Sequence, residues 1–252
     1  MRIHILGSGT STGVPEVGCT CEVCTSADPK DNRLRASSLI EINNKTLLID
    51  CGPDFREQIL RLGFRPITAV LMTHEHYDHV GGLDDLRPFS AKGELPIYGN
   101  AHTMENLRIR MPYCFAEKKY PGIPNISLHI VDSAQSFFID DLEIIPIQIM
   151  HGRFPILGYR IGKMAYITDM LTMADEEYEK LQGLDCLIMN ALRIKPHMTH
   201  QNLEQALTNA KRIGARDSYF IHMSHHMGLH KEMEKHLPEH IHFAYDGLEI
   251  AL

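Results

Sequence analysis

Apolar and polar positions alternate along this chain in a way that predicts many short strands interleaved with helices. Apolar runs bounded by turn residues predict strands at 2–6, 38–42, 46–49, 69–72, 96–98, 142–148, 157–161, 165–168, 186–189 and 218–221. Helical spacing of apolar residues predicts helices at 54–62, 102–111, 174–181, 203–213 and 229–237. Because the strands come in two runs that helices follow, we expect an α/β fold with two β-sheets packed face to face and helices outside.

Turn residues sharpen this picture at three places. Asn43-Asn44, between two of the strands, predicts a tight hairpin. Asp246-Gly247 predicts a second hairpin, between late strands at 241–244 and 248–250. Residues 114–126, which include Pro121 and Pro124, predict an exposed loop or insertion.

Composition favours one large globular domain over the whole of 1–252. The chain is 44% hydrophobic and 23% charged, and no stretch rich in Gly, Pro or Ser marks a boundary. Its formal charge of −7 argues against a broad basic surface, so nucleic acid is not an expected partner. No apolar run approaches the roughly 20 residues of a membrane span. Residues 1–7 read as a strand and a turn rather than a signal peptide, so we expect a cytoplasmic protein without a membrane partner.

The run THEHYDH at residues 73–79 carries the strongest chemical signal. Three imidazoles and a carboxylate lie within six residues, directly after a predicted buried strand. A strand that ends in a turn spreads consecutive side chains, so His74 and His76 can face one metal ion while Asp78 and His79 face a second. Mixed imidazole and carboxylate donors suit Zn, Mn or Fe, and paired ions roughly 3.5–4 Å apart are used to hydrolyse phosphate esters. Chance clustering is the alternative, because 16 residues of the chain are histidine.

Two ions need further ligands, and three residues at the ends of later predicted strands offer them. His151, Asp169 and His222 each follow an apolar run, so one edge of a sheet would present them together. Taken singly, each has an ordinary structural explanation. His151 would be a loop imidazole, Asp169 a helix N-cap and His222 a core histidine. Together with the run at 73–79, they predict a dinuclear metal site.

A second cluster of donors, Cys19, Cys21 and Cys24, has the spacing C-x-C-x-x-C. Three thiols in six residues suit a tetrahedral zinc site that lacks one ligand. The missing ligand could come from His225 or His226. The alternatives are buried cysteines, as expected for Cys51, Cys114 and Cys186, and a redox pair, which usually lies on a helix after a strand.

The combined pattern resembles the metallo-β-lactamase superfamily. The resemblance rests on His74-x-His76-x-Asp78-His79 with His151, Asp169 and His222, and on the segments 7–15 and 48–52. It implies an αββα sandwich of two mixed β-sheets, with metals at one edge. It also implies that His74, His76 and His151 hold one divalent ion. Asp78, His79 and His222 would hold the other, with Asp169 bridging the two ions.

Within that superfamily, the cysteine loop resembles the cyclic phosphodiesterases of the carbon–phosphorus lyase pathway. Those enzymes act on a phosphoribosyl 1,2-cyclic phosphate. The resemblance implies that His225 completes a structural zinc site with the three cysteines, and that His200 is an active-site residue. On the residues alone, Thr199 could equally cap the helix near 203 and leave His200 on the surface.

The function we expect is hydrolysis of a small, cyclic phosphodiester, such as a ribosyl cyclic phosphate or a nucleotide, by a hydroxide that bridges two Mn²⁺ or Zn²⁺ ions. His200 would contact the phosphate or protonate the leaving group, and Asp78 would be a ligand that also orients the nucleophile. The alternatives are a tRNA 3′-processing nuclease, a β-lactamase or thioesterase, and an accessory protein resembling coenzyme PQQ biosynthesis protein B. A redox di-iron protein would show Glu in place of His76. A homodimer stays open.

Overall fold

The computed structural model describes residues 1–91, 93–116 and 120–252. Among these residues the strands are β1 (Arg2–Gly7), β2 (Ser37–Ile42), β3 (Lys45–Ile49), β4 (Ala69–Leu71), β5 (Leu95–Gly99), β6 (Ile126–Ile130), β7 (Phe137–Ile139), β8 (Leu142–His151), β9 (Phe154–Ile161), β10 (Met164–Ile167), β11 (Cys186–Asn190), β12 (Asp217–Ile221), β13 (Ile241–Phe243) and β14 (Glu249–Ala251). The helices are α1 (Phe55–Leu62), α2 (Tyr77–Val80), α3 (Ala101–Arg110), α4 (Asp175–Glu179), α5 (Leu203–Ile213) and α6 (His230–Glu234).

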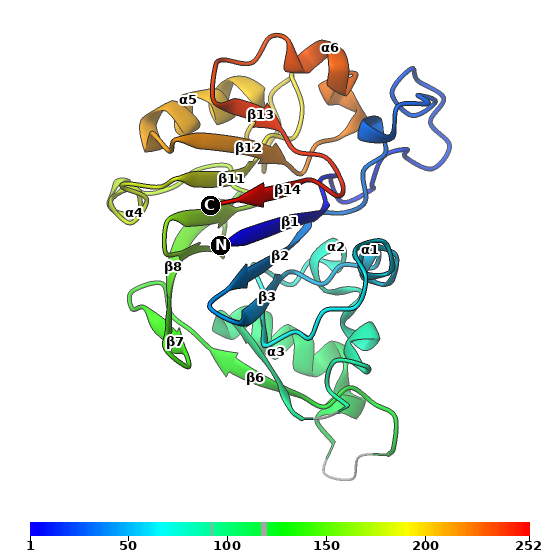
Figure 1. Cartoon of the computed structure of the whole chain (residues 1–252), viewed down its shortest axis with the longest axis vertical. Helices are drawn as coiled ribbons and strands as arrows, with labels where there is room; N and C mark the ends of the chain where they lie inside the picture. Colours follow the sequence, from blue (N-terminus) through cyan, green and yellow to red (C-terminus); the bar gives the residue numbers. More distant parts are fainter. Residues whose placement is uncertain (92, 117–119) are drawn as a thin grey trace.

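Within the described residues the strands form two seven-stranded sheets. The first sheet has the order β14-β1-β2-β3-β4-β5-β6, and the second has the order β13-β12-β11-β10-β9-β8-β7. Both are mixed, because β3 to β6 and β10 to β13 run parallel while their other neighbours pair antiparallel. Figure 1 shows α1, α2 and α3 on one outer side and α5 and α6 on the other. The predicted αββα sandwich is confirmed.

Side-chain alternation along the strands builds three apolar layers. On β3, Leu47 and Ile49 pack between the two sheets, whereas Leu48 packs on the opposite face, toward the helices. In the second sheet Ile188 faces the other sheet, and Leu187 packs with residues of α5. Burying each such side chain contributes roughly 1.5–3 kcal/mol, so the sandwich is held together on both faces of each sheet.

One predicted hairpin is confirmed and the other is wrong. Asn43 and Asn44 have φ of 48° and 60°, and they join β2 to β3 in the tight turn expected. Asp246-Gly247 also forms a turn, but it links β13 of the second sheet to β14 of the first. The Asp246 carboxylate accepts hydrogen bonds from the backbone N–H groups of Ser8 and Leu34, so it fixes a crossing between sheets.

The central elements match the predicted ranges, while two strands at sheet edges were not predicted. These are β6 and β7, each the last strand of its sheet. The loop predicted at 114–126 ends where β6 begins, at Ile126. Tyr120 in this loop is 59% exposed, as expected for an exposed loop, and residues 117–119 lie outside the described part of the chain. Among the described residues, no helix has the length and apolar character that a membrane span requires.

Candidate metal centre

The run at 73–79 occupies the turn between a buried strand and a single helical turn. β4 is fully buried, the next residues are irregular, and α2 begins directly after His76. The side chain of His74 therefore projects from the chain before the turn, while the side chains of Asp78 and His79 project from α2. His74, Asp78 and His79 are buried, and His76 is exposed. The local geometry spreads these donors toward two places, as the sequence predicts.

The predicted metal ligands come together in two neighbouring groups. Donor atoms of His74, His76 and His151 lie within 4.8 Å of one another and make the first ligand group. The second ligand group has the same closeness and consists of Asp78, His79, Asp169 and His222. The groups adjoin, because the rings of His74 and His79 are 4.2 Å apart. The structure thus gathers all seven predicted ligands, although their binding of metal stays a prediction.

Three residues around the site have left-handed backbone conformations directly after strands. Asp50 follows β3, Asp169 lies two residues after β10 and His222 follows β12, with φ of 58°, 58° and 57°. Such conformations are costly for residues other than glycine, and they concentrate at functional sites. Here they turn the side chains that follow β3, β10 and β12 toward the ligand groups.

Hydrogen bonds on the far side of the imidazoles set their orientation. Asp50, which is fully buried, accepts from Nδ1 of His79 at 2.7 Å and from the N–H and hydroxyl of Thr73 at 2.8 Å each. Nδ1 of His151 lies 2.9 Å from the carbonyl oxygen of Asp169, to which it donates. These bonds keep the protons on Nδ1, so Nε2 of His79 and His151 is left as a donor for metal.

The residues present fit a pair of divalent ions. Nε2 of His74, His79 and His222 is buried and makes no hydrogen bond to any described residue. Nε2 of His79 instead lies 3.1 Å from the Asp78 carboxylate and 3.3 Å from that of Asp169. Buried imidazole nitrogens that face carboxylates without hydrogen bonds are costly unless a cation lies between them. Imidazole with carboxylate is a donor set that suits Zn or Mn.

Charges at the site favour ionised carboxylates. Burial would raise the pKa of Asp169, but the imidazoles of His222 and His79 outweigh it and hold that pKa well below its usual range. The pKa of Asp78 is likewise lowered, because the imidazole of His79 overcomes the effect of burial. Burial lowers the pKa of His74 well below its usual value, which keeps this imidazole neutral. Burial opposes a charge on His79, but the carboxylates of Asp78 and Asp169 raise its pKa well above the usual value, so this ring would lose a proton when a metal ion binds.

His200 lies in the site rather than on the surface. Its Nε2 is 2.8 Å from Oδ1 of Asp169, and its side chain is only 12% exposed. Donor atoms of His151, Asp169 and His200 form a further group within 4.8 Å. Burial lowers the pKa of His200, and the hydrogen bond that its ring donates to Asp169 opposes this effect. Its catalytic role, like that of Asp78, stays a prediction.

The alternative role for Thr199, as a helix cap, is wrong. The N-cap of α5 is Asn202, whose side chain accepts from the N–H of Gln205, while the Gln205 side chain accepts from the N–H of Asn202. The hydroxyl of Thr199 lies 2.9 Å from Nδ1 of His200 instead. Thr199 thereby holds the ring of His200 from the side opposite Asp169.

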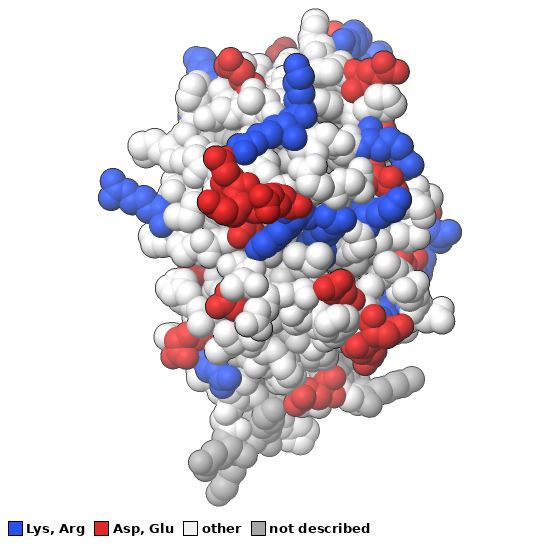
Figure 2. Space-filling model, turned by 90° about the vertical axis from the view of Figure 1, so that its left-hand side faces the viewer, with Lys and Arg blue, Asp and Glu red and all other residues white. Residues whose placement is uncertain are grey.

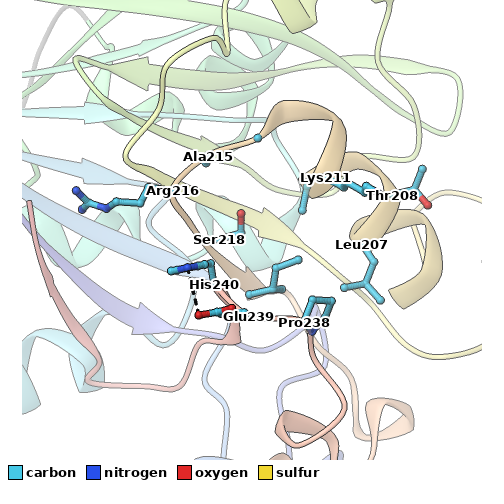
Figure 3. Close-up of a pocket in the computed structure, with 12 residues that line it drawn as sticks. Leu207, Thr208, Lys211, Ala215, Arg216, Ser218, Pro238, Glu239 and His240 are labelled. Carbon is cyan, nitrogen blue, oxygen red and sulfur yellow. Dashed lines mark ion pairs between the residues drawn. The ribbon is translucent and has the colours of Figure 1, made fainter.

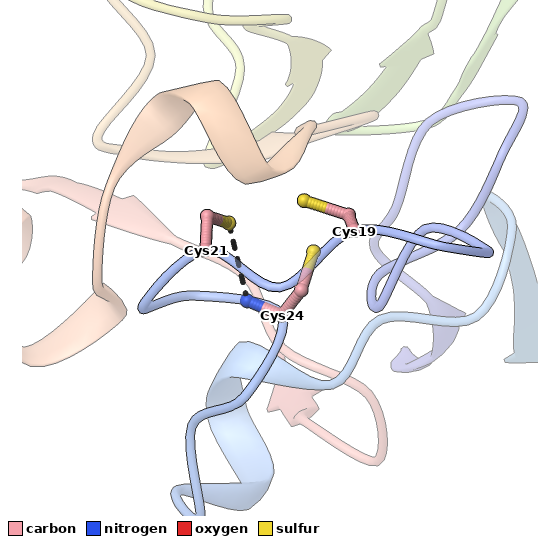
Figure 4. Close-up of side chains that lie close together, drawn as sticks. All are labelled: Cys19, Cys21 and Cys24. Carbon is pink, nitrogen blue, oxygen red and sulfur yellow. Dashed lines mark hydrogen bonds between the residues drawn. The ribbon is translucent and has the colours of Figure 1, made fainter.

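The three cysteines of the N-terminal loop also come together. Their sulfur atoms lie within 4.8 Å of one another, and Figure 4 shows the thiol groups of Cys19 and Cys24 side by side. The backbone N–H of Cys24 donates to Sγ of Cys21 at 3.5 Å, and this bond is the main reason that the pKa of Cys21 is lowered. Burial raises the pKa of Cys24 to about 11. Sulfur ligands this close suit a tetrahedral zinc site.

His225 does not belong to that cysteine group as the structure stands. Its Nδ1 lies 3.4 Å from the Glu16 carboxylate, and its Nε2 lies 3.1 Å from Nε2 of His226. The backbone N–H of Glu16 donates to Sγ of Cys24, so Glu16 contacts both His225 and one of the cysteines. The fourth ligand of this zinc site therefore stays a prediction. Cys51, Cys114 and Cys186 are buried, as expected.

Sequence reasoning missed the roles of Asp50 and Thr73. Asp50 was visible as an acidic residue directly after an apolar strand, the same signal that identified Asp169.

A separate hollow of about 460 Å³ lies between α5, β12 and β13, and Figure 3 shows Arg216, His240 and Lys211 around it. None of the residues that line it belongs to the ligand groups.

Comparison with known proteins agrees with this geometry. Residues 45–223 match the family described as the Beta-lactamase superfamily domain. The chain therefore belongs to the β-lactamase superfamily and has the fold of its metal-dependent hydrolases, which implies divalent metal ions. It is also similar to a crystal structure described as a new diphosphatase from the PhnP family, with a TM-score of 0.92 and 39% identity over 100% of this chain and 97% of that one. Within the superfamily the chain groups with the PhnP family, which confirms the predicted resemblance.

Other relatives carry different names. An octanoyltransferase of Porphyromonas gingivalis is 51% identical over 99% of this chain, but the chain spans only 51% of that protein. Coenzyme PQQ synthesis protein B of Methylobacterium radiotolerans is 29% identical over 75% of this chain and 72% of that protein. The structure of human tRNase Z, short form, has a TM-score of 0.73 at 18% identity over 100% of this chain and 99% of that one, which shows a shared fold alone.

Proposed function

We propose that this chain is a metal-dependent phosphodiesterase that hydrolyses a small, cyclic phosphodiester. One observation carries the proposal: seven imidazole and carboxylate donors form two adjoining ligand groups. Asp169 belongs to the second group and also lies close to His151 of the first group and to His200. The diphosphatase with 39% identity supports chemistry at phosphorus. A phosphodiester bond and a diphosphate bond present the same charged phosphorus centre to such a site.

The residues of the site would have different roles in hydrolysis. Two divalent ions, bound by the two ligand groups, would activate water and neutralise phosphate charge. Asp50, itself held by Thr73, orients His79, and the carbonyl of Asp169 orients His151, so these two imidazoles are preorganised. Asp78, besides its place as a ligand, would orient the attacking water. His200 lies between Asp169 and Thr199, and in its protonated form it would contact the phosphate or give one proton to the leaving oxygen, which leaves a neutral imidazole.

The octanoyltransferase name supports a second candidate, acyl transfer, because the identity of 51% extends over almost all of this chain. Half of that relative lies outside the match, however, so its name does not say which half carries the activity. The gathered donors in this half fit hydrolysis at phosphorus. We therefore expect the chain alone to hydrolyse phosphodiesters and to transfer no octanoyl group.

A tRNA 3′-processing activity has less support. The formal charge is −7, and Figure 2 shows Lys and Arg interspersed with Asp and Glu on one face of the molecule. An extended RNA needs a continuous basic surface. An accessory role like that suggested by the PQQ protein B name would not need a complete set of seven donors.

The test is a panel of substrates offered to protein reconstituted with Mn²⁺ or with Zn²⁺. It contains 2′,3′-cyclic nucleotides, ribosyl 1,2-cyclic phosphate, linear diesters, dinucleoside diphosphates, a precursor tRNA and an octanoyl-carrier donor. We expect turnover of small phosphodiesters, cyclic ones above all, that a chelator abolishes and added metal restores. Turnover of the octanoyl donor or the tRNA alone would overturn the proposal.

A further inference from the structure

A hollow of about 490 Å³ lies beside the first ligand group, between the two sheets. Residues after β5 and β6 of the first sheet line one wall, and residues of β8 and β9 of the second sheet line the other. The side chain of Asn100 reaches across and donates to the carbonyl oxygen of Pro155 at 3.4 Å. Its volume falls in the range of pockets that hold small organic ligands.

Three links join this hollow to the metal centre. Glu75, which lines it, stands between His74 and His76 in the chain. Phe154, which also lines it, pairs with His151 across the β8–β9 hairpin. A group bound in the hollow would therefore lie next to the reacting phosphate, in the place of a substituent that does not itself react.

The lining selects the chemistry of that substituent. Phe154 and Ile130 are 63% and 66% exposed, although both are large and apolar, so they offer flat apolar surface. Glu75 and Asp132 supply carboxylates, and none of the described residues that line the hollow is Lys or Arg. The oxygens of Glu75 lie near Nε2 of His102 and the hydroxyl of Thr103, and each has a further lone pair with which to accept. This surface repels a second phosphate and favours an uncharged ring that carries N–H donors.

We propose that this hollow, which we call the side pocket, binds the base of a nucleoside-bearing substrate, with the base stacked on Phe154. The proposal rests on the proposed phosphodiesterase function and narrows its substrate class to nucleotides. Stacking of a base on an aromatic side chain supplies affinity with little dependence on which base is bound. The acceptors at the rim then receive hydrogen bonds from ring and amino N–H groups.

The experiment compares two matched substrates, adenosine 2′,3′-cyclic phosphate and methyl β-ribofuranoside 2,3-cyclic phosphate, which differ only in the base. With wild-type protein we expect kcat/KM for the adenosine compound to be about tenfold higher or more. Phe154→Ala should lower kcat/KM for the adenosine compound roughly five- to a hundredfold, and leave the methyl riboside unchanged. Phe138→Ala is the control, because Phe138 is 60% exposed but does not line the pocket.

Binding measurements separate this inference from the proposed function. Calorimetry on metal-loaded protein compares AMP with ribose 5-phosphate, and the affinity for AMP should fall with Phe154→Ala alone. If no diester is turned over but this difference remains, the proposed function fails and the side pocket stands. The opposite outcome is that both substrates are turned over equally, AMP and ribose 5-phosphate bind with equal affinity, and Phe154→Ala has no effect. That outcome would overturn the side pocket while the phosphodiesterase proposal stands.

Discussion

Replacing Asp50 by Asn should weaken metal binding at the second ligand group without removing any ligand. Asp50 is fully buried and accepts from the Thr73 N–H, the Thr73 hydroxyl and Nδ1 of His79. An asparagine can still accept from the Thr73 N–H, but its amide N–H₂ then faces the hydroxyl and the ring. The ring avoids that clash by moving its proton to Nε2, the atom that would bind metal.

The size of the effect follows from that rearrangement. Loss of a partner behind a metal-binding histidine typically costs ten- to a hundredfold in metal affinity, which is about 1.4–2.7 kcal/mol. Leaving a buried donor unpaired costs a further 1–3 kcal/mol or so of folding stability. His79 of the second ligand group contacts Asp50 directly, whereas His74 of the first is linked to it only through the Thr73 hydroxyl, 3.0 Å from Nδ1 of His74. The ion at the second group should therefore be weakened more than the ion at the first.

The assay is competition against a fluorescent zinc chelator, with the metal content of the dialysed protein counted by mass spectrometry. We expect the Kd at the second ligand group to rise ten- to a hundredfold and the Kd at the first to rise less. Asp246→Asn is the matched control, since Asp246 also accepts three hydrogen bonds but from Ser8 and Leu34, neither of which belongs to the ligand groups. Wild-type affinity for both ions in Asp50→Asn would refute the reasoning.

Three further predictions follow from named contacts. His200→Ala should lower kcat on a cyclic diester by about 10²–10⁴ while both active-site ions stay bound, and unchanged kcat would remove His200 from the chemistry. Cys21→Ser should lose one zinc equivalent and lower the Tm, with the other ions retained; an unaltered zinc count would contradict the cysteine site. Burial raises the pKa of Asp246 from 3.8 to about 6, so the folded chain holds this proton longer than the unfolded chain. Stability from this group is therefore present below pH 4 and lost as the pH rises to about 6. Between these pH values the free energy of unfolding of the metal-free wild type should fall by about 2–3 kcal/mol relative to that of Asp246→Asn, which has no carboxyl to titrate. Parallel pH profiles for the two proteins would disprove it.

Much of the site could be predicted from the sequence because its ligands occur at a position that a local pattern reveals, the end of an apolar strand. Each candidate ligand of the ion pair outside the run at 73–79 comes at or just after the end of an apolar strand, and the sandwich brings those ends to one edge. Helix α5 was predicted with its observed bounds, Leu203–Ile213, because its apolar residues keep helical spacing throughout. Local periodicity and strand ends are properties of short segments, so a single sequence reveals them.

Contacts between distant segments were not readable. The role of Asp50 depends on Thr73 and His79, which lie 23 and 29 residues further along the chain. Likewise, the turn at Asp246-Gly247 has the composition of a hairpin, and only its bonds to Ser8 and Leu34 make it a crossing between sheets. Strands β6 and β7 escaped prediction although their sequences, ISLHI and FFI, are largely apolar.

The most direct test of the central claim is anomalous diffraction from crystals grown with Mn²⁺ and, separately, with Zn²⁺. We predict two peaks in the active site, one within reach of His74, His76 and His151 and the other within reach of Asp78, His79 and His222, with the Asp169 carboxylate contacting both. A single peak at full metal occupancy, or two peaks with Asp169 turned away from both, would contradict the account.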